Sequence, residues 1–87
     1  MAFARAMAIQ YAPTIRVNCI VPGTMNAPMN ASLLSSDKNV NELIARIPLG
    51  RLGTSDDIAG LSAFLASDES AYCTGGVYLV DGGLTAY

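Results

Sequence analysis

The residues best suited to bind a ligand lie in two glycine-containing turns of this 87-residue chain. The first turn lies within Pro22 to Met29, and the second is Asp81-Gly82-Gly83. Gly23 allows the backbone to turn sharply and a ligand to approach it closely. The exposed backbone amides of such a turn could bind a carboxamide or a phosphate, although the same residues also fit an ordinary turn after a strand.

Other kinds of site are excluded by what the sequence lacks. The 87 residues contain no histidine, which excludes a Ser-His-Asp or Cys-His catalytic centre and a His-ligated zinc site within them. Cys19 and Cys73 do not form a C-x-x-C pair, so we expect two buried free thiols and no metal site. The formal net charge of -2 provides no basic surface for nucleic acid or an anionic membrane.

Two strands are predicted to position these turns. In Ile15 to Val21 every second residue is apolar, and Pro22-Gly23 ends this strand. The second strand is Val77 to Asp81, and Gly82-Gly83 ends it. Ligands of open parallel sheets bind beyond the carboxyl ends of the strands, which is where both turns would lie.

Three helices are predicted, at residues 1–12, 39–47 and 56–66, with a long loop over 22–38. Thr54 and Asp57 resemble a capping box at the start of the third helix. The order helix, strand, loop, helix, helix, strand predicts an α/β fold in which a helical crossover joins two parallel strands.

The composition is unusually apolar for so short a chain. Apolar residues make up 52 % and charged residues only 14 %, whereas charged residues are about 25 % of ordinary globular proteins. Small chains bury a smaller share of their surface than large ones and should be more polar. We therefore expect much of the apolar surface to meet another polypeptide. The helix over 1–12 is apolar on nearly every face and is predicted to be buried.

A series of motifs in the same order resembles the short-chain dehydrogenase/reductase family over essentially the whole chain. In chain order the motifs are Arg16-Val17-Asn18, Pro22-Gly23, Pro28-Met29, Ile47 to Gly53, Asp57-Ile58-Ala59, Phe64 to Asp68, Thr74-Gly75-Gly76 and Val80 to Gly83. Members of this family are NAD- or NADP-dependent oxidoreductases. The resemblance implies that residues 1–87 form the C-terminal part of a Rossmann-type parallel sheet.

The resemblance also assigns a cofactor loop. Pro22, Gly23, Met25 and Ala27 match positions that line the nicotinamide side of NAD or NADP, with backbone groups of Met25 facing the carboxamide. The family usually has threonine at the position of Ala27, and the threonine hydroxyl bonds the cofactor. Alanine cannot make this bond, so Ala27 either weakens the cofactor contact or is a tolerated variant.

Residues 22–47 are expected to form a cofactor and substrate region. Met29, Leu33 and Leu34 match the variable substrate lid of the family, although methionine and leucine at such spacing are also typical of a core. The polar residues within the motifs are expected to be structural; these are Arg16, Asn18, Arg51 and Asp81.

No catalytic residue is assigned. The family's Tyr-x-x-x-Lys, its serine segment and its Gly-x-x-x-Gly-x-Gly cofactor loop do not occur, since the only lysine is Lys38 and Leu34 stands four positions before it. We expect the chain to be truncated before the Tyr-x-x-x-Lys and to be inactive alone. Its partner would be the missing N-terminal half or full-length relatives, in a homo- or hetero-oligomer.

An alternative is a non-catalytic interaction module that docks onto full-length relatives. The sequence shows no signal peptide and no transmembrane segment, so we expect a cytoplasmic protein without a membrane partner.

Overall fold

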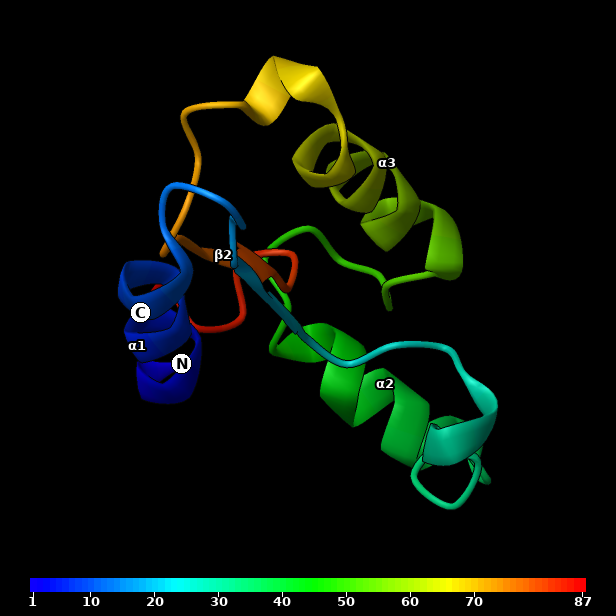
Figure 1. Cartoon of the computed structure of the whole chain (residues 1–87). Coiled ribbons are helices and arrows are strands. Elements are labelled where there is room, and N and C mark those ends of the chain that lie inside the picture. The colour runs from blue at the N-terminus through cyan, green and yellow to red at the C-terminus, as the bar shows by residue number, and fades with distance from the viewer.

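The computed structural model describes all residues, 1–87, and the predicted order of elements is confirmed. The chain forms two strands, three α-helices and two short 3₁₀ helices (Figure 1). In chain order these are α1 (Ala2–Tyr11), β1 (Cys19–Pro22), η1 (Pro28–Asn30), α2 (Asp37–Ala45), α3 (Ser55–Ala66), η2 (Asp68–Ser70) and β2 (Val77–Val80).

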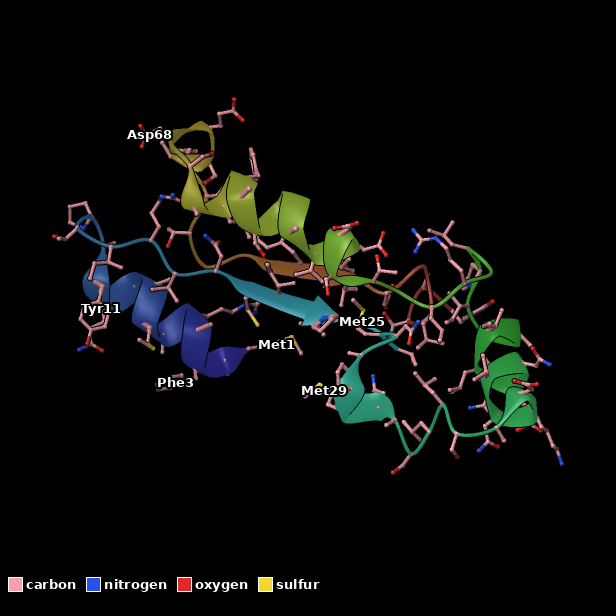
Figure 2. The ribbon with its side chains drawn as sticks, turned by 90° about the vertical axis from the view of Figure 1, so that its right-hand side faces the viewer. Met1, Phe3, Tyr11, Met25, Met29 and Asp68 are labelled. Atoms are coloured by element: carbon pink, nitrogen blue, oxygen red, sulfur yellow. The ribbon has the colours of Figure 1, made fainter.

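The two strands form a parallel pair, as predicted. Cys19 is paired with Val77 and Pro22 with Val80, so both strands end at the same edge. Figure 2 shows α1 and α3 on opposite sides of this pair. The arrangement is that of an α/β fold with helices on both sides of its sheet.

The prediction that β1 starts at Ile15 is wrong, because the residues before Cys19 face a turn instead of a strand. The turn contains Gly75, whose φ of 73° lies in the left-handed region. The Val17 carbonyl accepts the Gly75 N–H at 2.7 Å, and the Asn18 side chain bonds the Cys73 carbonyl and the Gly76 N–H at 3.0 and 3.1 Å. Hydrogen bonds of the Asn18 side chain therefore take the place of regular strand pairing before Cys19.

The helix starts follow from local capping. The predicted capping box of α3 is present, with the Thr54 N–H donating to Asp57 Oδ2 at 2.8 Å. Helix α2 begins two residues earlier than predicted, because the Ser36 hydroxyl accepts the Asn39 N–H at 3.2 Å and so makes Ser36 the N-cap.

Few side chains are buried in this open structure. Only Ala8, Ile47 and Ser70 are buried, and the accessible surface is 6200 Å². A compact monomer of 9.1 kDa would expose about 4,900 Å². The radius of gyration is 15.5 Å, against about 12 Å for a compact domain of this length.

The prediction that the first helix is buried is therefore wrong for this chain. Phe3 and Ile9 of α1 are 76 % and 82 % exposed, because a sheet of two strands is too narrow to cover the helix. The two cysteines are free thiols but half-buried rather than buried. A large apolar surface is thus open to contact.

Candidate functional site

An open cavity of about 490 Å³ lies beyond the carboxyl ends of β1 and β2. Both glycine-containing turns contribute to its lining, and the segment between α2 and α3 completes it. The lining residues are Thr24, Met25, Pro48, Leu49, Arg51, Gly53, Asp57, Leu79, Val80, Asp81, Gly82 and Gly83. The cavity volume falls within the range of about 300–1,000 Å³ that is usual for small-molecule sites.

The turn after β1 depends on glycine at position 23. The Gly23 N–H donates to the Val80 carbonyl at 2.9 Å, which brings the turn against the end of β2. A Cβ on Gly23 would lie 2.7 Å from the Asp81 Cα and 2.6 Å from its Cβ. Because Asp81 contributes backbone here, a side chain could be accommodated only if the two turns moved apart.

The turn after β2 is closed by the side chain of Asp81. Its carboxylate accepts the Thr85 hydroxyl at 2.6 Å and the Gly83 N–H at 2.9 Å. These two bonds lower the pKa of Asp81, the Thr85 bond contributing most. Asp81 therefore has the structural role that the sequence predicts.

Arg51 and Asp57 form a paired contact at the rim of the cavity. The guanidinium donates to the two carboxylate oxygens at 2.7 and 2.8 Å. The Arg51 hydrogen bond, followed by the Thr54 N–H, holds the pKa of Asp57 well below its usual range, and the pair raises the pKa of Arg51. The pair fixes the segment before α3, so Arg51 is also structural.

The lowered pKa values of Asp57 and Asp81 predict that acid destabilises the fold. Each has a lowered pKa in the folded chain, so the unfolded chain binds more protons as the pH falls and acid favours unfolding. We expect the thermal midpoint to be level above pH 5 and to fall as the pH drops below the ordinary aspartate value of 3.8. The measurement is a series of circular dichroism melts.

The same melts on Asp57→Asn and Asp81→Asn test the origin of the effect. Each variant is expected to have a lower midpoint at neutral pH and a smaller fall in acid than the unchanged chain. If the thermal midpoint fell equally in acid for the unchanged chain and both variants, Asp57 and Asp81 would not be the source of the acid sensitivity.

The backbone N–H and C=O groups of Met25 point away from Gly53. A parallel bridge joins the two residues, in which Gly53 donates to the Thr24 carbonyl at 3.0 Å and accepts the Asn26 N–H at 2.8 Å. The only cis peptide bond is Ala12-Pro13, so the peptide groups flanking Met25 are trans. The N–H and C=O of Met25 itself therefore both point to the other side.

The two backbone groups of Met25 differ in their partners. The carbonyl accepts the Ala27 N–H at 3.0 Å and Asn30 Nδ2 at 2.8 Å. The N–H groups of Thr24 and Met25 have no hydrogen-bond partner within the chain. The turn therefore offers free amide donors, as the sequence suggests. Asn30 was not predicted from the sequence, where the only available signal was an amide side chain five residues after Met25.

The four residues predicted to contact the cofactor lie along one stretch of chain, and only Met25 lines the cavity. Pro22 ends β1 and is exposed, and Gly23 forms the close turn behind the lining. Ala27 is half-buried immediately before η1. Figure 2 shows Met25 just beyond the arrow of β1 and Met29 on η1.

The three predicted lid residues do not line this cavity. Met29 is 89 % exposed on η1, and Leu34 is half-buried in the turns that follow. Leu33 lies over α2, where a second hollow of about 200 Å³ is lined by Leu33, Asn39, Glu42, Leu43 and Arg46. The structure thus places Leu33 beside α2, and none of the three predicted lid residues lines the cavity to which Met25 contributes.

No three His, Cys, Asp or Glu side chains come together as a metal ion would need. None of the helices has the length and apolar character needed to cross a membrane.

Comparison with known protein families gives one clear match. Residues 1–85 match the family model described as "Enoyl-(Acyl carrier protein) reductase". The chain is 42 % identical over 84 residues to 3beta-hydroxysteroid dehydrogenase 1 of Eggerthella lenta, covering 95 % of this chain and 32 % of the relative. It is 49 % identical over 70 residues to the L-rhamnose 1-dehydrogenase (NAD(P)(+)) of Azotobacter vinelandii, covering 80 % of this chain and 27 % of the relative.

Several solved structures of similar fold contain nicotinamide cofactors. A gluconate 5-dehydrogenase of Burkholderia cenocepacia in complex with NADP and tartrate superposes with a TM-score of 0.93 at 32 % identity, covering 99 % of this chain and 34 % of the other. A 4-hydroxyisoleucine dehydrogenase complexed with NADH superposes with a TM-score of 0.92 at 28 % identity, covering 99 % of this chain and 36 % of the other. The chain thus spans about a third of the length of the proteins that it matches.

Proposed function

Because this chain belongs to the short-chain dehydrogenase/reductase family, we propose that it is part of an NAD(P)-dependent oxidoreductase that interconverts a carbonyl and a hydroxyl group. Within it, residues 22–47 contact the cofactor and substrate. The observation that carries this proposal is the position of Met25, whose free N–H lies in the turn beyond the carboxyl end of β1, the edge at which parallel sheets bind ligands.

The residues present fit one end of the cofactor. The Met25 N–H can donate to a carboxamide oxygen, and Gly23 allows the close turn against Asp81 that positions this N–H. No Gly-x-x-x-Gly-x-Gly turn occurs in the 87 residues, so nothing here matches the family's way of holding the pyrophosphate. We therefore assign to this chain the nicotinamide end alone.

When bound, NAD(P) supplies or accepts the hydride. The part of this chain in the reaction is to hold the nicotinamide end and to cover the substrate. The free N–H of Met25 fixes the orientation of the ring. Met29 on η1, with Leu33 and Leu34 in the turns between η1 and α2, forms the substrate lid. The family's tyrosine acid/base and its lysine do not occur in the 87 residues, so we expect these residues alone not to transfer hydride.

A hybrid protein tests this proposal. In it, the chain replaces the matching third of 3beta-hydroxysteroid dehydrogenase 1 of Eggerthella lenta. Fluorescence titration with NADH and NADPH is expected to show saturable binding to the hybrid and none to the 87-residue chain. The unaltered relative serves as the positive control. A hybrid with the helical content and melting behaviour of its parent that binds neither cofactor would refute the proposal.

Ala27 offers a gain-of-affinity test in the hybrid. Its backbone is extended, with φ of -137° and ψ of 155°, so a β-branched side chain fits without strain. Ala27→Thr restores the hydroxyl that the family uses, and one added hydrogen bond is expected to tighten cofactor binding about 2- to 12-fold. The matched control is Ala31→Thr at the exposed end of η1, which should leave the affinity unchanged. Equal effects of both changes would contradict the assignment of Ala27.

A second candidate function is docking onto full-length relatives without catalysis. It is favoured by the large apolar side chains left exposed on opposite sides of the sheet, among them Phe3 and Ile9 on α1, Phe64 on α3 and Leu79 on β2. Co-purification of the tagged chain with a full-length relative, together with no cofactor binding by the hybrid, would favour docking over the oxidoreductase.

A further inference from the structure

The backbone at Met25 is complementary to a primary carboxamide. Its N–H and C=O lie on the same side, away from Gly53, as a neighbouring donor and acceptor. A primary carboxamide presents the opposite pair, a carbonyl oxygen that accepts and an NH₂ that donates. A nicotinamide ring seated here would use both groups of Met25.

The acceptor half of this pair is already occupied from within the chain. The Met25 carbonyl has two lone pairs, of which one accepts the Ala27 N–H at 3.0 Å and the other Asn30 Nδ2 at 2.8 Å. The donor half, the Met25 N–H, has no such partner. The side chain of Asn30, itself a carboxamide, therefore makes the bond that the NH₂ of a ligand carboxamide would make.

The backbone holds Asn30 firmly in this position. Its N–H donates to the Ala27 carbonyl at 2.9 Å, and its own carbonyl accepts the Leu34 N–H at 3.0 Å. The residue closes η1 and is half-buried. The contact with Met25 is thus built into the start of the lid.

We propose, on the basis of the function proposed above, that Asn30 is a specificity-determining residue that occupies the carboxamide acceptor of the nicotinamide site. The ring is then held through the Met25 N–H alone while Asn30 stays in place. As a result, the chain does not distinguish a carboxamide from another carbonyl group at the same ring position. Removal of the Asn30 amide opens the acceptor and restores that distinction.

Two small probes separate the donor and acceptor halves of the site. Nicotinamide carries the NH₂ group, whereas 3-acetylpyridine carries a methyl group in its place and can only accept. Both are titrated into the ¹⁵N-labelled hybrid, and the shift of the Met25 amide resonance gives each affinity. The variants are Asn30→Ala and Asn30→Asp, which has nearly the same shape but no N–H donor. The matched control is Asn41→Ala, which alters an exposed amide without hydrogen bonds on α2.

The unchanged hybrid and its Asn41→Ala control are expected to bind the two probes equally. In Asn30→Ala and Asn30→Asp, nicotinamide should bind about 2- to 12-fold more tightly, as expected for one added hydrogen bond, with no change for 3-acetylpyridine. Equal changes for both probes, or no change for either, would overturn the role of Asn30. If neither probe moved the Met25 resonance in any variant, the proposed nicotinamide site would be wrong and this inference with it. NAD and its 3-acetylpyridine analogue give the same comparison in the hybrid.

Discussion

Replacing Arg16 by methionine is expected to destabilise the chain by about 3 kcal/mol, since hydrogen bonds to charged groups contribute about 1.5–3 kcal/mol each. The guanidinium is half-buried and donates to the carbonyls of Leu65 at 3.0 Å, Ser67 at 3.2 Å and Cys73 at 3.1 Å. These bonds tie the end of α3 and the turn before β2 to the segment that leads into β1. Methionine fills similar space but cannot donate to the three carbonyls, which would keep only their bonds to Asn18 and Ser70.

Urea denaturation followed by circular dichroism measures this loss. Arg46→Met is the matched control, because Arg46 is exposed and makes no side-chain hydrogen bond. Arg16→Lys should lie between the two, since a single ammonium cannot reproduce the planar fork of donors. If Arg16→Met were no more destabilising than the control, these bonds would not hold the helix to the sheet.

Replacing Gly23 by alanine is expected to destabilise the chain by about 1–3 kcal/mol, as overpacking does in other proteins. The added Cβ would meet the Asp81 backbone at 2.7 Å, so the ends of β1 and β2 must separate. In the hybrid, this separation should also displace Met25 and weaken cofactor binding at least tenfold. This loss of affinity should be seen even under conditions in which the hybrid stays folded.

Gly60→Ala is the matched control for this substitution. A Cβ at Gly60 has no neighbour within 4 Å, and alanine favours a helix interior by about 1 kcal/mol over glycine. The control should therefore stabilise α3 and leave cofactor affinity unchanged. A Gly23→Ala hybrid with full affinity would show that the close approach to Asp81 does not position the site.

Features set by short stretches of sequence were predictable. The capping box of Thr54 and Asp57 and the glycine turns after both strands depend on residues a few positions apart, and the structure shows all of them. The parallel pairing followed from the helices between the strands. The structural role of Asp81 was also correctly predicted.

Features that depend on distant neighbours were not predictable. The start of β1 is set by the turn at Gly75, more than fifty positions away along the chain. Helix α1 has the apolar pattern of a buried element, yet burial also requires a sheet wide enough to cover it. The contact between Asn30 and Met25 joins residues only five positions apart, but it depends on how η1 folds back, which the residue types do not show.

Hydride transfer tests the central claim most directly. The measurement is the rate of NADH and NADPH oxidation with a panel of ketones and aldehydes, for the 87-residue chain, for the hybrid and for its parent enzyme. We expect turnover by the hybrid and none by the chain alone. Specific reduction of a carbonyl compound by the 87 residues unaided, or a folded hybrid that binds no cofactor and transfers no hydride, would contradict the account.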